Sequence, residues 1–243
     1  MSESVRSMFS QIAPRYDLTN DVLSLGTHRY WRKKAVKLTR ATPGNKVLDC
    51  ATGTGDLALA FKRAVGPQGH VTGTDFCADM LNLAPAKAAK AGLNVHFEVA
   101  DATALPYPDD SFDIVSISFG IRNVDNPQRC LLEMARVLKH GGRALILEFG
   151  QPKGLFGGCF RLYSKCVIPF IGKCLTGNRS AYEYLPKTSA TFPSGKAFLK
   201  LMDETSAFHK TQAHPLSLGI AYAYVGEVSK PPQKPNFEAQ SNP

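Results

Sequence analysis

The sequence predicts an α/β fold, a Rossmann-like and mostly parallel sheet of about seven strands with helices on both faces. Between residues 46 and 149, short apolar segments of strand length alternate with longer segments of helical periodicity. A glycine turn directly follows the first strand, and two more strand-like segments lie near the end of the chain. Strands that alternate with helices pair in parallel, because each helix returns the chain along a face of the sheet.

Each element follows from its local pattern. Strands are expected where short runs of apolar, β-branched and aromatic residues stop at turn-forming residues, at 46–50, 70–75, 95–99, 112–118, 143–149, 209–213 and 220–228. Helices are expected where apolar residues recur at helical spacing, at 56–65, 78–91, 127–138 and 194–206.

Three regions flank or interrupt this pattern. Residues 1–40 are expected to form a helical cap over the site, because Val5, Met8 and Ile12 lie at helical spacing. The main domain is expected at 41–229, with an insertion at 152–190 whose first part is apolar, basic and rich in glycine. Residues 230–243 are polar and rich in proline, a composition typical of a disordered tail.

The composition narrows the choice of partners. The formal net charge of +9 favours either nucleic acid or an acidic membrane face, and no nucleic-acid recognition motif accompanies it. No stretch approaches the ~20 apolar residues that span a bilayer, and the polar start does not resemble a signal peptide, so a cytoplasmic protein is expected. None of the six cysteines has the spacing of a zinc site, so we expect reduced thiols and no metal.

A strand, a glycine turn and a helix start follow one another at residues 47–56, Val-Leu-Asp-Cys-Ala-Thr-Gly-Thr-Gly-Asp. Gly53 and Gly55 allow a ligand to approach the backbone, and the helix start offers free N–H groups. In open parallel sheets, ligands bind at the carboxyl ends of the strands. A dinucleotide is one candidate, because residues 53–58 match the loose Gly-x-Gly-x-x-Ala pattern.

Acidic residues at the ends of successive strands favour a different ligand. Asp49 would repel a pyrophosphate, but it suits the ammonium group of a methionine moiety. Asp75 ends the second strand, where it can accept from both ribose hydroxyls, and Asp101 next to Ala102 can accept from an adenine amino group. Together these residues predict S-adenosylmethionine as the cofactor.

Three stretches are similar to one family, the ubiquinone/menaquinone biosynthesis C-methyltransferases. They are residues 9–24, Phe-Ser-Gln-Ile-Ala-Pro-Arg-Tyr-Asp-Leu-Thr-Asn-Asp-Val-Leu-Ser, which continue into His-Arg-Tyr-Trp-Arg at 28–32; residues 117–124, Ile-Ser-Phe-Gly-Ile-Arg-Asn-Val; and residues 136–142, Arg-Val-Leu-Lys-His-Gly-Gly. The resemblance extends from residue 5 to about residue 228. His140 departs from the family pattern, which usually has proline there, and the segment 154–176 is less familiar.

The resemblance implies a class I S-adenosylmethionine-dependent methyltransferase that methylates a ring carbon of a polyprenylated quinol. It places cofactor contacts at Thr54, Asp75, Asp101, Ala102 and Ser118. Demethylmenaquinol is the favoured acceptor, because no mitochondrial-type leader precedes the domain. The alternatives are the 2-polyprenyl-6-methoxy-1,4-benzoquinol of ubiquinone biosynthesis, another small apolar acceptor, and a non-catalytic scaffold of the quinone pathway.

The same resemblance suggests how the acceptor is activated. A phenolate oxygen makes the adjacent ring carbon nucleophilic, and Arg122 is the candidate cation beside that oxygen. The alternative is a structural salt bridge from Arg122 to Asp17 or Asp125. Tyr16 and Asn123 are expected to position the quinol, although Tyr16 could equally pack the N-terminal helices. No histidine is typical of a base, so bound water is expected to take the proton.

A polyprenyl tail requires access to the bilayer. Residues 29–37 and 155–175 combine aromatic or aliphatic side chains with lysine and arginine, a composition suited to an anionic membrane surface. Peripheral association with the inner face of the cytoplasmic membrane is therefore expected, with a buried lid as the alternative role for 155–175. A homodimer is a further possibility.

Overall fold

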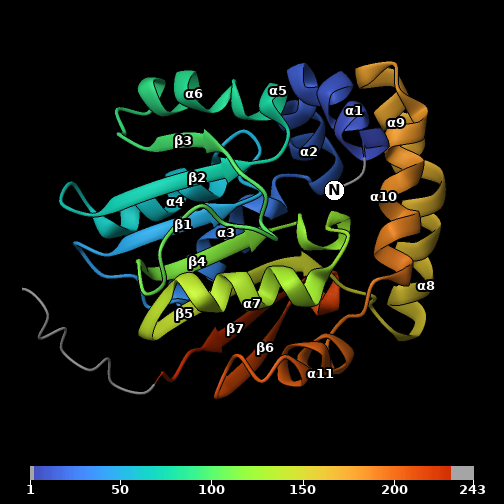
Figure 1. The fold of residues 1–243 in the computed structure, drawn as a ribbon. Helices are drawn as coiled ribbons and strands as arrows, with labels where there is room; N and C mark the ends of the chain where they lie inside the picture. Colours follow the sequence, from blue (N-terminus) through green and yellow to red (C-terminus); the bar gives the residue numbers. More distant parts are fainter. Residues whose placement is uncertain (1–2, 231–243) are drawn as a thin grey trace, which may run out of the picture.

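The structure, a computed structural model, describes residues 3–230; the tail expected at 230–243 therefore lies outside the described residues apart from Lys230. A seven-stranded sheet has the order β3-β2-β1-β4-β5-β7-β6. The first five strands are parallel, and β7 is antiparallel to both β5 and β6. Their bounds are β1 Lys46–Cys50, β2 His70–Asp75, β3 His96–Val99, β4 Phe112–Ser118, β5 Leu138–Phe149, β6 Lys210–Leu216 and β7 Ala221–Glu227. The predicted α/β class is confirmed (Figure 1).

Helices cover both faces of this sheet. On one face lie α3 (Thr27–Leu38) and α4 (Asp56–Val65), whose apolar side chains Trp31 and Phe61 are buried against the strands. On the other face lie α7 (Pro127–Val137) and α11 (Lys196–Glu204), which bury Met134 and Phe198 in a second core. The cores on both faces hold the carboxyl ends of the parallel strands in fixed positions, and that edge carries the candidate site.

Three expected elements have wrong boundaries. The strand expected at 143–149 begins at Leu138 as β5. The helix expected at 78–91 is divided into α5 (Ala78–Leu81) and α6 (Ala84–Lys90), because Pro85 lacks a backbone N–H and is suited only to the first turn of a new helix. The strand expected at 209–213 continues to Leu216 as β6. Its Pro215 is tolerated because β6 is an edge strand.

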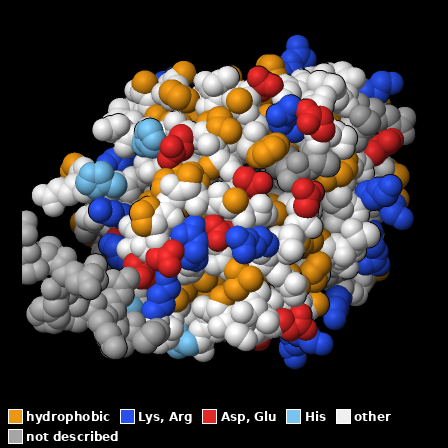
Figure 2. Space-filling view, viewed as in Figure 1, with side chains coloured by type: hydrophobic (Ala, Val, Ile, Leu, Met, Phe, Trp, Pro, Cys, Tyr) orange, Lys and Arg blue, Asp and Glu red, His pale blue; other side chains and the backbone are white. Residues whose placement is uncertain are grey.

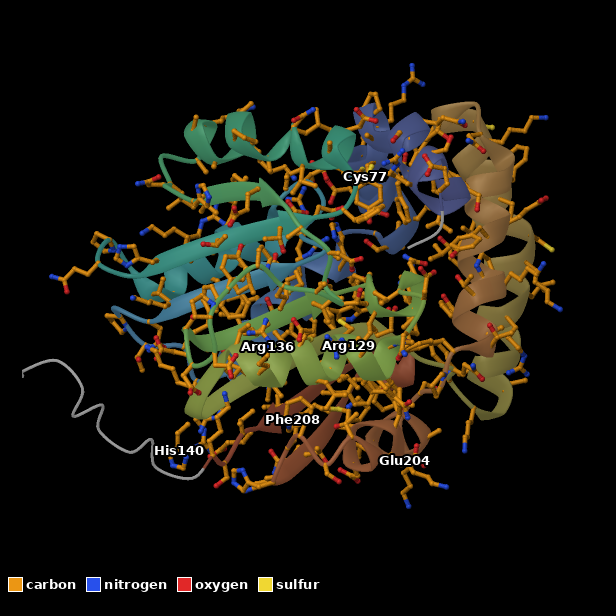
Figure 3. The ribbon with its side chains drawn as sticks, in the orientation of Figure 1. Cys77, Arg129, Arg136, His140, Glu204 and Phe208 are labelled. Atoms are coloured by element: carbon orange, nitrogen blue, oxygen red, sulfur yellow. The ribbon has the colours of Figure 1, made fainter. Side chains whose placement is uncertain are left out.

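The N-terminal residues form α1 (Glu3–Ile12), a 3₁₀ turn (Ala13–Arg15) and α2 (Tyr16–Ser24). These helices lie near the carboxyl ends of β1 and β2, and Cys77 at the start of α5 packs against α1 (Figure 3). Ile12 also contacts the insertion, in a small apolar cluster with Ile168 and Tyr182. The N-terminal helices and the insertion therefore form one layer across that edge of the sheet (Figure 1).

The insertion is helical in spite of its glycines. It consists of α8 (Gly154–Leu162), a π-helical turn (Tyr163–Val167), α9 (Ile168–Thr176) and α10 (Arg179–Thr191). Pro169, which has no N–H for an ordinary helical bond, is the second residue of α9 after the π turn. Gly172 allows α9 to approach α10, since a Cβ there would lie 2.1 Å from the Tyr182 ring. None of the helices within residues 3–230 combines the length and apolar character needed to cross a membrane.

Candidate active site

The glycine turn after β1 is tied to β2 by one carboxylate. Asp75, only 6% exposed, accepts a hydrogen bond from the Gly53 N–H at 2.8 Å and another from the Cys77 N–H at 2.8 Å. Burial raises the pKa of this carboxyl. Gly55 has a φ of +87°, and a Cβ there would lie 3.1 Å from Phe97, so the turn requires glycine. The predicted residues Gly53, Gly55 and Asp75 therefore lie together.

Asp49 has a different environment from the one expected. Its carboxylate is fully buried and accepts from the Ser116 hydroxyl and the Thr52 hydroxyl, both at 2.6 Å. Burial raises the pKa of Asp49 to about 6. Each oxygen therefore accepts a hydrogen bond beneath the turn, and the direct contact of Asp49 with an ammonium group stays a prediction. Asp49 supports the turn from below.

The next strands add the remaining residues predicted for the cofactor. Asp101 follows β3 and accepts from both the N–H and the hydroxyl of Thr103, each at 2.8 Å. Its neighbour Ala102 is half-buried beside the core of the α7 face. Ser118 is half-buried as the last residue of β4. The N–H of residue 100 donates to the Asp75 carbonyl at 3.2 Å, so the loop that carries Asp101 begins beside Asp75.

Thr54 connects the glycine turn to the N-terminal helices. Its buried hydroxyl donates to Asp17 of α2 at 2.6 Å and accepts from Lys87 of α6 at 2.9 Å. Lys87 also forms ion pairs with Asp17 at 2.5 Å and Asp56 at 2.6 Å. We call Asp17, Thr54, Asp56 and Lys87 the latch. Local sequence patterns do not reveal it, because its members come from three separate helices and one turn.

A cavity of about 600 Å³ lies between the N-terminal helices, the insertion and the ends of β4 and β5. Its lining is mainly apolar and includes Tyr16 and Arg122. One wall is aromatic: the Phe119 ring lies 4.5 Å from that of Phe149 and 6.2 Å from that of Trp31, measured between centroids. This space suits a flat, apolar ring system.

Arg122 lies on the 3₁₀ turn Ile121–Asn123 and is paired with Glu148 of β5. Its Nη1 donates to Glu148 Oε1 at 2.8 Å and to the Phe119 carbonyl at 2.6 Å. The guanidinium also lies over the Phe149 ring, 5.2 Å from its centroid. The salt-bridge partners considered from the sequence, Asp17 and Asp125, were wrong. The sequence signal for Glu148 was a lone charge in the apolar run Leu-Ile-Leu-Glu-Phe.

The two residues expected to position a substrate, Tyr16 and Asn123, differ in whether they line the cavity. Tyr16 lines the cavity, burial raises the pKa of its hydroxyl, and its ring packs edge-on against Phe9. Asn123 is buried behind the wall and accepts from the Tyr184 hydroxyl at 3.1 Å. Tyr184, which sequence reasoning missed, lines the cavity instead. Asn123 is thus connected to the cavity lining by its hydrogen bond with Tyr184.

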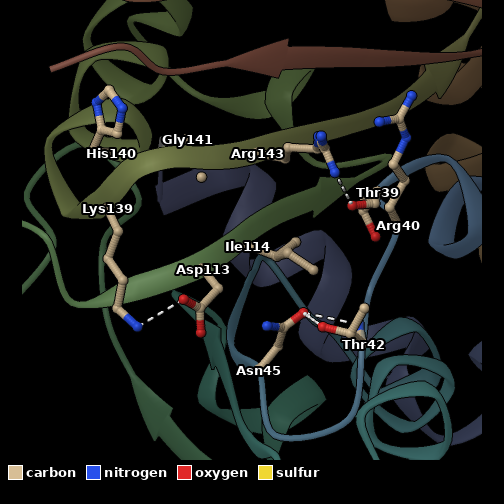
Figure 4. Close-up of a pocket in the computed structure, with 11 residues that line it drawn as sticks. Thr39, Arg40, Thr42, Asn45, Asp113, Ile114, Lys139, His140, Gly141 and Arg143 are labelled. Atoms are coloured by element: carbon tan, nitrogen blue, oxygen red, sulfur yellow. Dashed lines mark hydrogen bonds and ion pairs between the residues drawn. The ribbon is translucent and has the colours of Figure 1, made fainter.

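A second, smaller pocket of about 240 Å³ lies at the opposite end of the sheet (Figure 4). Its lining is polar and includes the ion pair of Lys139 with Asp113, 2.7 Å apart. It contains none of the residues predicted for cofactor or substrate. Among residues 3–230, no three histidine, cysteine, aspartate or glutamate side chains gather closely enough to hold a metal ion.

Known proteins resemble this chain over nearly all of its length. Residues 1–227 match the model of the ubiE/COQ5 methyltransferase family. A "Ubiquinone/menaquinone biosynthesis C-methyltransferase UbiE" of Bdellovibrio bacteriovorus is 54% identical over 93% of this chain and 96% of its own. A "Demethylmenaquinone methyltransferase" of Deinococcus radiodurans is 46% identical over 93% and 92%.

Solved structures agree on the fold. A SAM-dependent methyltransferase of Thermotoga maritima, titled a possible histamine N-methyltransferase, has a TM-score of 0.64 at 20% identity, covering 91% of this chain and 98% of its own. One from Aquifex aeolicus has a TM-score of 0.59 at 20% identity, covering 81% and 89%. The seven-stranded sheet, the glycine turn and the extent of the family match lead to one assignment. The chain belongs to the ubiE/COQ5 methyltransferase family.

Proposed function

We propose that the protein transfers the methyl group of S-adenosylmethionine to a ring carbon of a polyprenylated quinol, with demethylmenaquinol as the acceptor. The observation that carries the proposal is the apolar, aromatic-walled cavity beside the glycine turn, with the buried guanidinium of Arg122 in its wall. A relative named demethylmenaquinone methyltransferase supports this acceptor. A second candidate is the methoxylated benzoquinol, because another relative carries both pathway names.

The donor would lie along the carboxyl ends of β1 to β4. Gly53, Thr54 and Gly55 would approach it through their backbone, Asp75 would accept from the ribose hydroxyls, and Asp101 would accept from the adenine amino group. Ala102 and Ser118 would complete that side of the crevice. Asp75 already accepts from one N–H group on each oxygen, and each oxygen keeps a further lone pair that could accept from a ribose hydroxyl.

The chain's own residues would then prepare the acceptor. When bound, the donor supplies a methyl group already activated by a sulfonium. The aromatic wall and Tyr16 would hold the quinol ring so that its carbon faces the methyl group. As the quinol hydroxyl loses its proton to water, Arg122 would stabilise the oxyanion. The ring carbon then bonds to the methyl group as the methyl–sulfur bond breaks, and the bonding electrons stay with the sulfur of the leaving S-adenosylhomocysteine. The ring carbon loses its own proton to water, and the oxygen regains a proton.

The acceptor's tail would reach the cavity from a membrane surface. Around the cavity, three leucines on separate turns or helix ends are largely exposed: Leu25 at 89%, Leu155 at 88% and Leu218 at 78%. Lys and Arg side chains gather along the edge formed by the insertion helices (Figure 2), and Arg161 and Lys165 are among those exposed. Leucines beside cations suit an anionic interface. Cytoplasmic location and a homodimer stay predictions.

The test is methyl transfer from labelled S-adenosylmethionine to two chemically reduced acceptors, a short-chain demethylmenaquinol and a short-chain methoxybenzoquinol. Label in the first alone supports the proposal, and label in the second alone favours the alternative. Arg122→Ala should lose at least about a hundredfold in kcat, the usual scale for removing an oxyanion donor. Label in neither acceptor, with the donor still bound, would overturn the quinol proposal and favour a scaffold or another acceptor.

A further inference from the structure

The buried pair of Arg122 and Glu148 contains two polar atoms that no described residue satisfies. These are Nε of Arg122 and Oε2 of Glu148, which have almost no accessible surface. The two side chains are 5% and 1% exposed. Buried polar atoms are nearly always hydrogen-bonded, and those of charged groups are the most costly to leave unpaired. The Arg122 side chain lines the cavity, so a ligand oxygen there is a natural partner for an N–H of its guanidinium.

The orientation of that N–H depends on Glu148. Arg122 comes from a short 3₁₀ turn, whereas Glu148 is anchored near the end of the central strand β5. Glu148 Oε1 accepts from Arg122 Nη1 and from the Phe149 N–H, both at 2.8 Å. The Phe149 ring lies against the guanidinium. The strand thus fixes the carboxylate, and the carboxylate fixes the plane of the guanidinium.

We infer that Glu148 is a positioning residue for methyl transfer: it holds Arg122 so that a guanidinium N–H meets the acceptor oxygen, and its negative charge sets how acidic that oxygen becomes. The inference rests on the proposed function. Glu148 forms and breaks no bond in the reaction, since the hydroxyl proton leaves to water. Because Arg122 and Glu148 together carry no net charge, the cavity would accept a neutral quinol. The same pair would still stabilise the oxyanion that forms from it.

Other charged or titratable groups face this pair from each packed element. They are Tyr16 on α2, Tyr184 on α10 and Tyr224 on β7, and Arg32 on α3 in turn acts on Tyr16. They stay in place when Glu148 alone is changed. A changed pH dependence in such a variant would therefore report the charge of Glu148.

Glu148→Gln is the first variant, because the amide keeps the shape and loses the charge. The measurement is kcat against pH with reduced short-chain demethylmenaquinol under argon. Without the carboxylate, the unbalanced guanidinium lowers the pKa of the bound quinol, so the pH of half-maximal kcat should fall by about one to two pH units. The plateau kcat should fall about ten- to a hundredfold through misorientation, with KM within about threefold.

Glu133→Gln is the matched control. Glu133 is another buried glutamate paired with an arginine, Arg136 at 2.8 Å, but it lies on α7 and does not line the cavity. Figure 3 labels its partner Arg136. This control should lower thermal stability without moving the pH of half-maximal kcat. Glu148→Asp keeps the charge and shortens the side chain. Glu148→Asp should have the pH profile of the wild type, and its plateau kcat should be as low as that of Glu148→Gln.

The outcomes separate the two proposals. An unmoved pH profile in Glu148→Gln, whatever its melting temperature, would overturn the positioning role. If that variant does not fold, Glu148→Asp decides: a kcat equal to wild type would overturn the role, and a tenfold loss at unchanged melting temperature would support it. Absence of transfer to any quinol by the wild type would overturn the proposed function, and this inference would fall with it.

Discussion

Replacing Asp49 with asparagine should make the protein more stable at neutral pH. The Asp49 carboxyl is fully buried, and its pKa rises from 3.8 to about 6 on folding. A rise of this size corresponds to about 3 kcal/mol, at 1.36 kcal/mol for each pH unit. Because the folded pKa is raised, the folded protein holds this proton more tightly than the unfolded chain does. The favourable contribution is complete below pH 3.8 and is lost as the pH rises through about 6.

Asparagine does not titrate, so Asp49→Asn removes this dependence. Its amide can accept from one of the two hydroxyls, Thr52 or Ser116, and donate to the other. The free energy of unfolding of the variant, minus that of the wild type, should therefore rise by about 2 kcal/mol between pH 4.5 and pH 7.5, because about 1.5 of the 2.2 pH units between 3.8 and 6 lie in this range. Urea unfolding followed by circular dichroism at several pH values measures this difference.

Asp21→Asn provides the control. The hydrogen bond from Arg29 lowers the pKa of Asp21 to about 2, so its stabilising contribution is complete above 3.8 and is lost only as the pH falls towards 2. Because Asp21 is also paired with His28, which titrates in this range, the control is made in a His28→Gln background, where Asp21→Asn should show a constant loss of stability between pH 4.5 and pH 7.5. A constant difference for Asp49→Asn over the same range would refute the reasoning, because it would mean that burial imposes little cost on the Asp49 charge.

Three further perturbations test other parts of the structure. Gly172→Ala places a Cβ about where the Tyr182 ring lies, so it should cost about 1–3 kcal/mol and increase proteolysis within 154–191; unchanged cleavage would contradict the packing of α9 on α10. Lys87→Met removes the central cation of the latch, so hydrogen exchange of residues 3–24 should become faster. Equal exchange in the variant and the wild type would contradict a stabilising role of the latch. Leu25→Glu combined with Leu218→Glu should weaken flotation with anionic vesicles at least about tenfold. Equal flotation of that variant and the wild type would refute the membrane surface.

The sequence predicted the central strands closely because their signals are local. The bounds expected for 46–50, 70–75 and 112–118 are those observed for β1, β2 and β4. Each is a short apolar run that ends at a turn residue, so no distant contact is needed to locate it. The insertion offered no such signal, because its glycines disfavour a helix in isolation. Only the packing of Gly172 against Tyr182 explains why a glycine is tolerated there.

The candidate site shows the same difference between local and long-range signals. The carboxyl ends of successive strands brought Asp75 and the glycine turn together, as parallel pairing requires. Local sequence did not reveal that Ser116 is a partner of Asp49, because its hydroxyl reaches the carboxylate only once β1 lies beside β4. Glu148 was missed for a similar reason. The inferred role of Glu148 depends on its ion pair with Arg122, which is 26 residues away along the chain.

The raised pKa values of Asp49 and Asp75 give a final prediction for the proposed donor. Both carboxyls lie at the glycine turn, and burial is the largest cause of each shift. S-adenosylmethionine carries a sulfonium and an ammonium, so its binding favours the charged carboxylates and lowers their pKa. Below pH 6 binding must release protons, and affinity should rise with pH until about 6 and then level off.

Isothermal titration calorimetry in buffers of different ionisation enthalpy measures both the affinity and the number of protons released. Asp49→Asn should release fewer protons near pH 6 than the wild type does. S-adenosylhomocysteine, which lacks the sulfonium charge, should show a shallower pH dependence. An affinity for S-adenosylmethionine that is equal at pH 5 and pH 7.5 would mean that the donor's charges do not act on these carboxyls, and the crevice at the ends of β1 and β2 would not be its site.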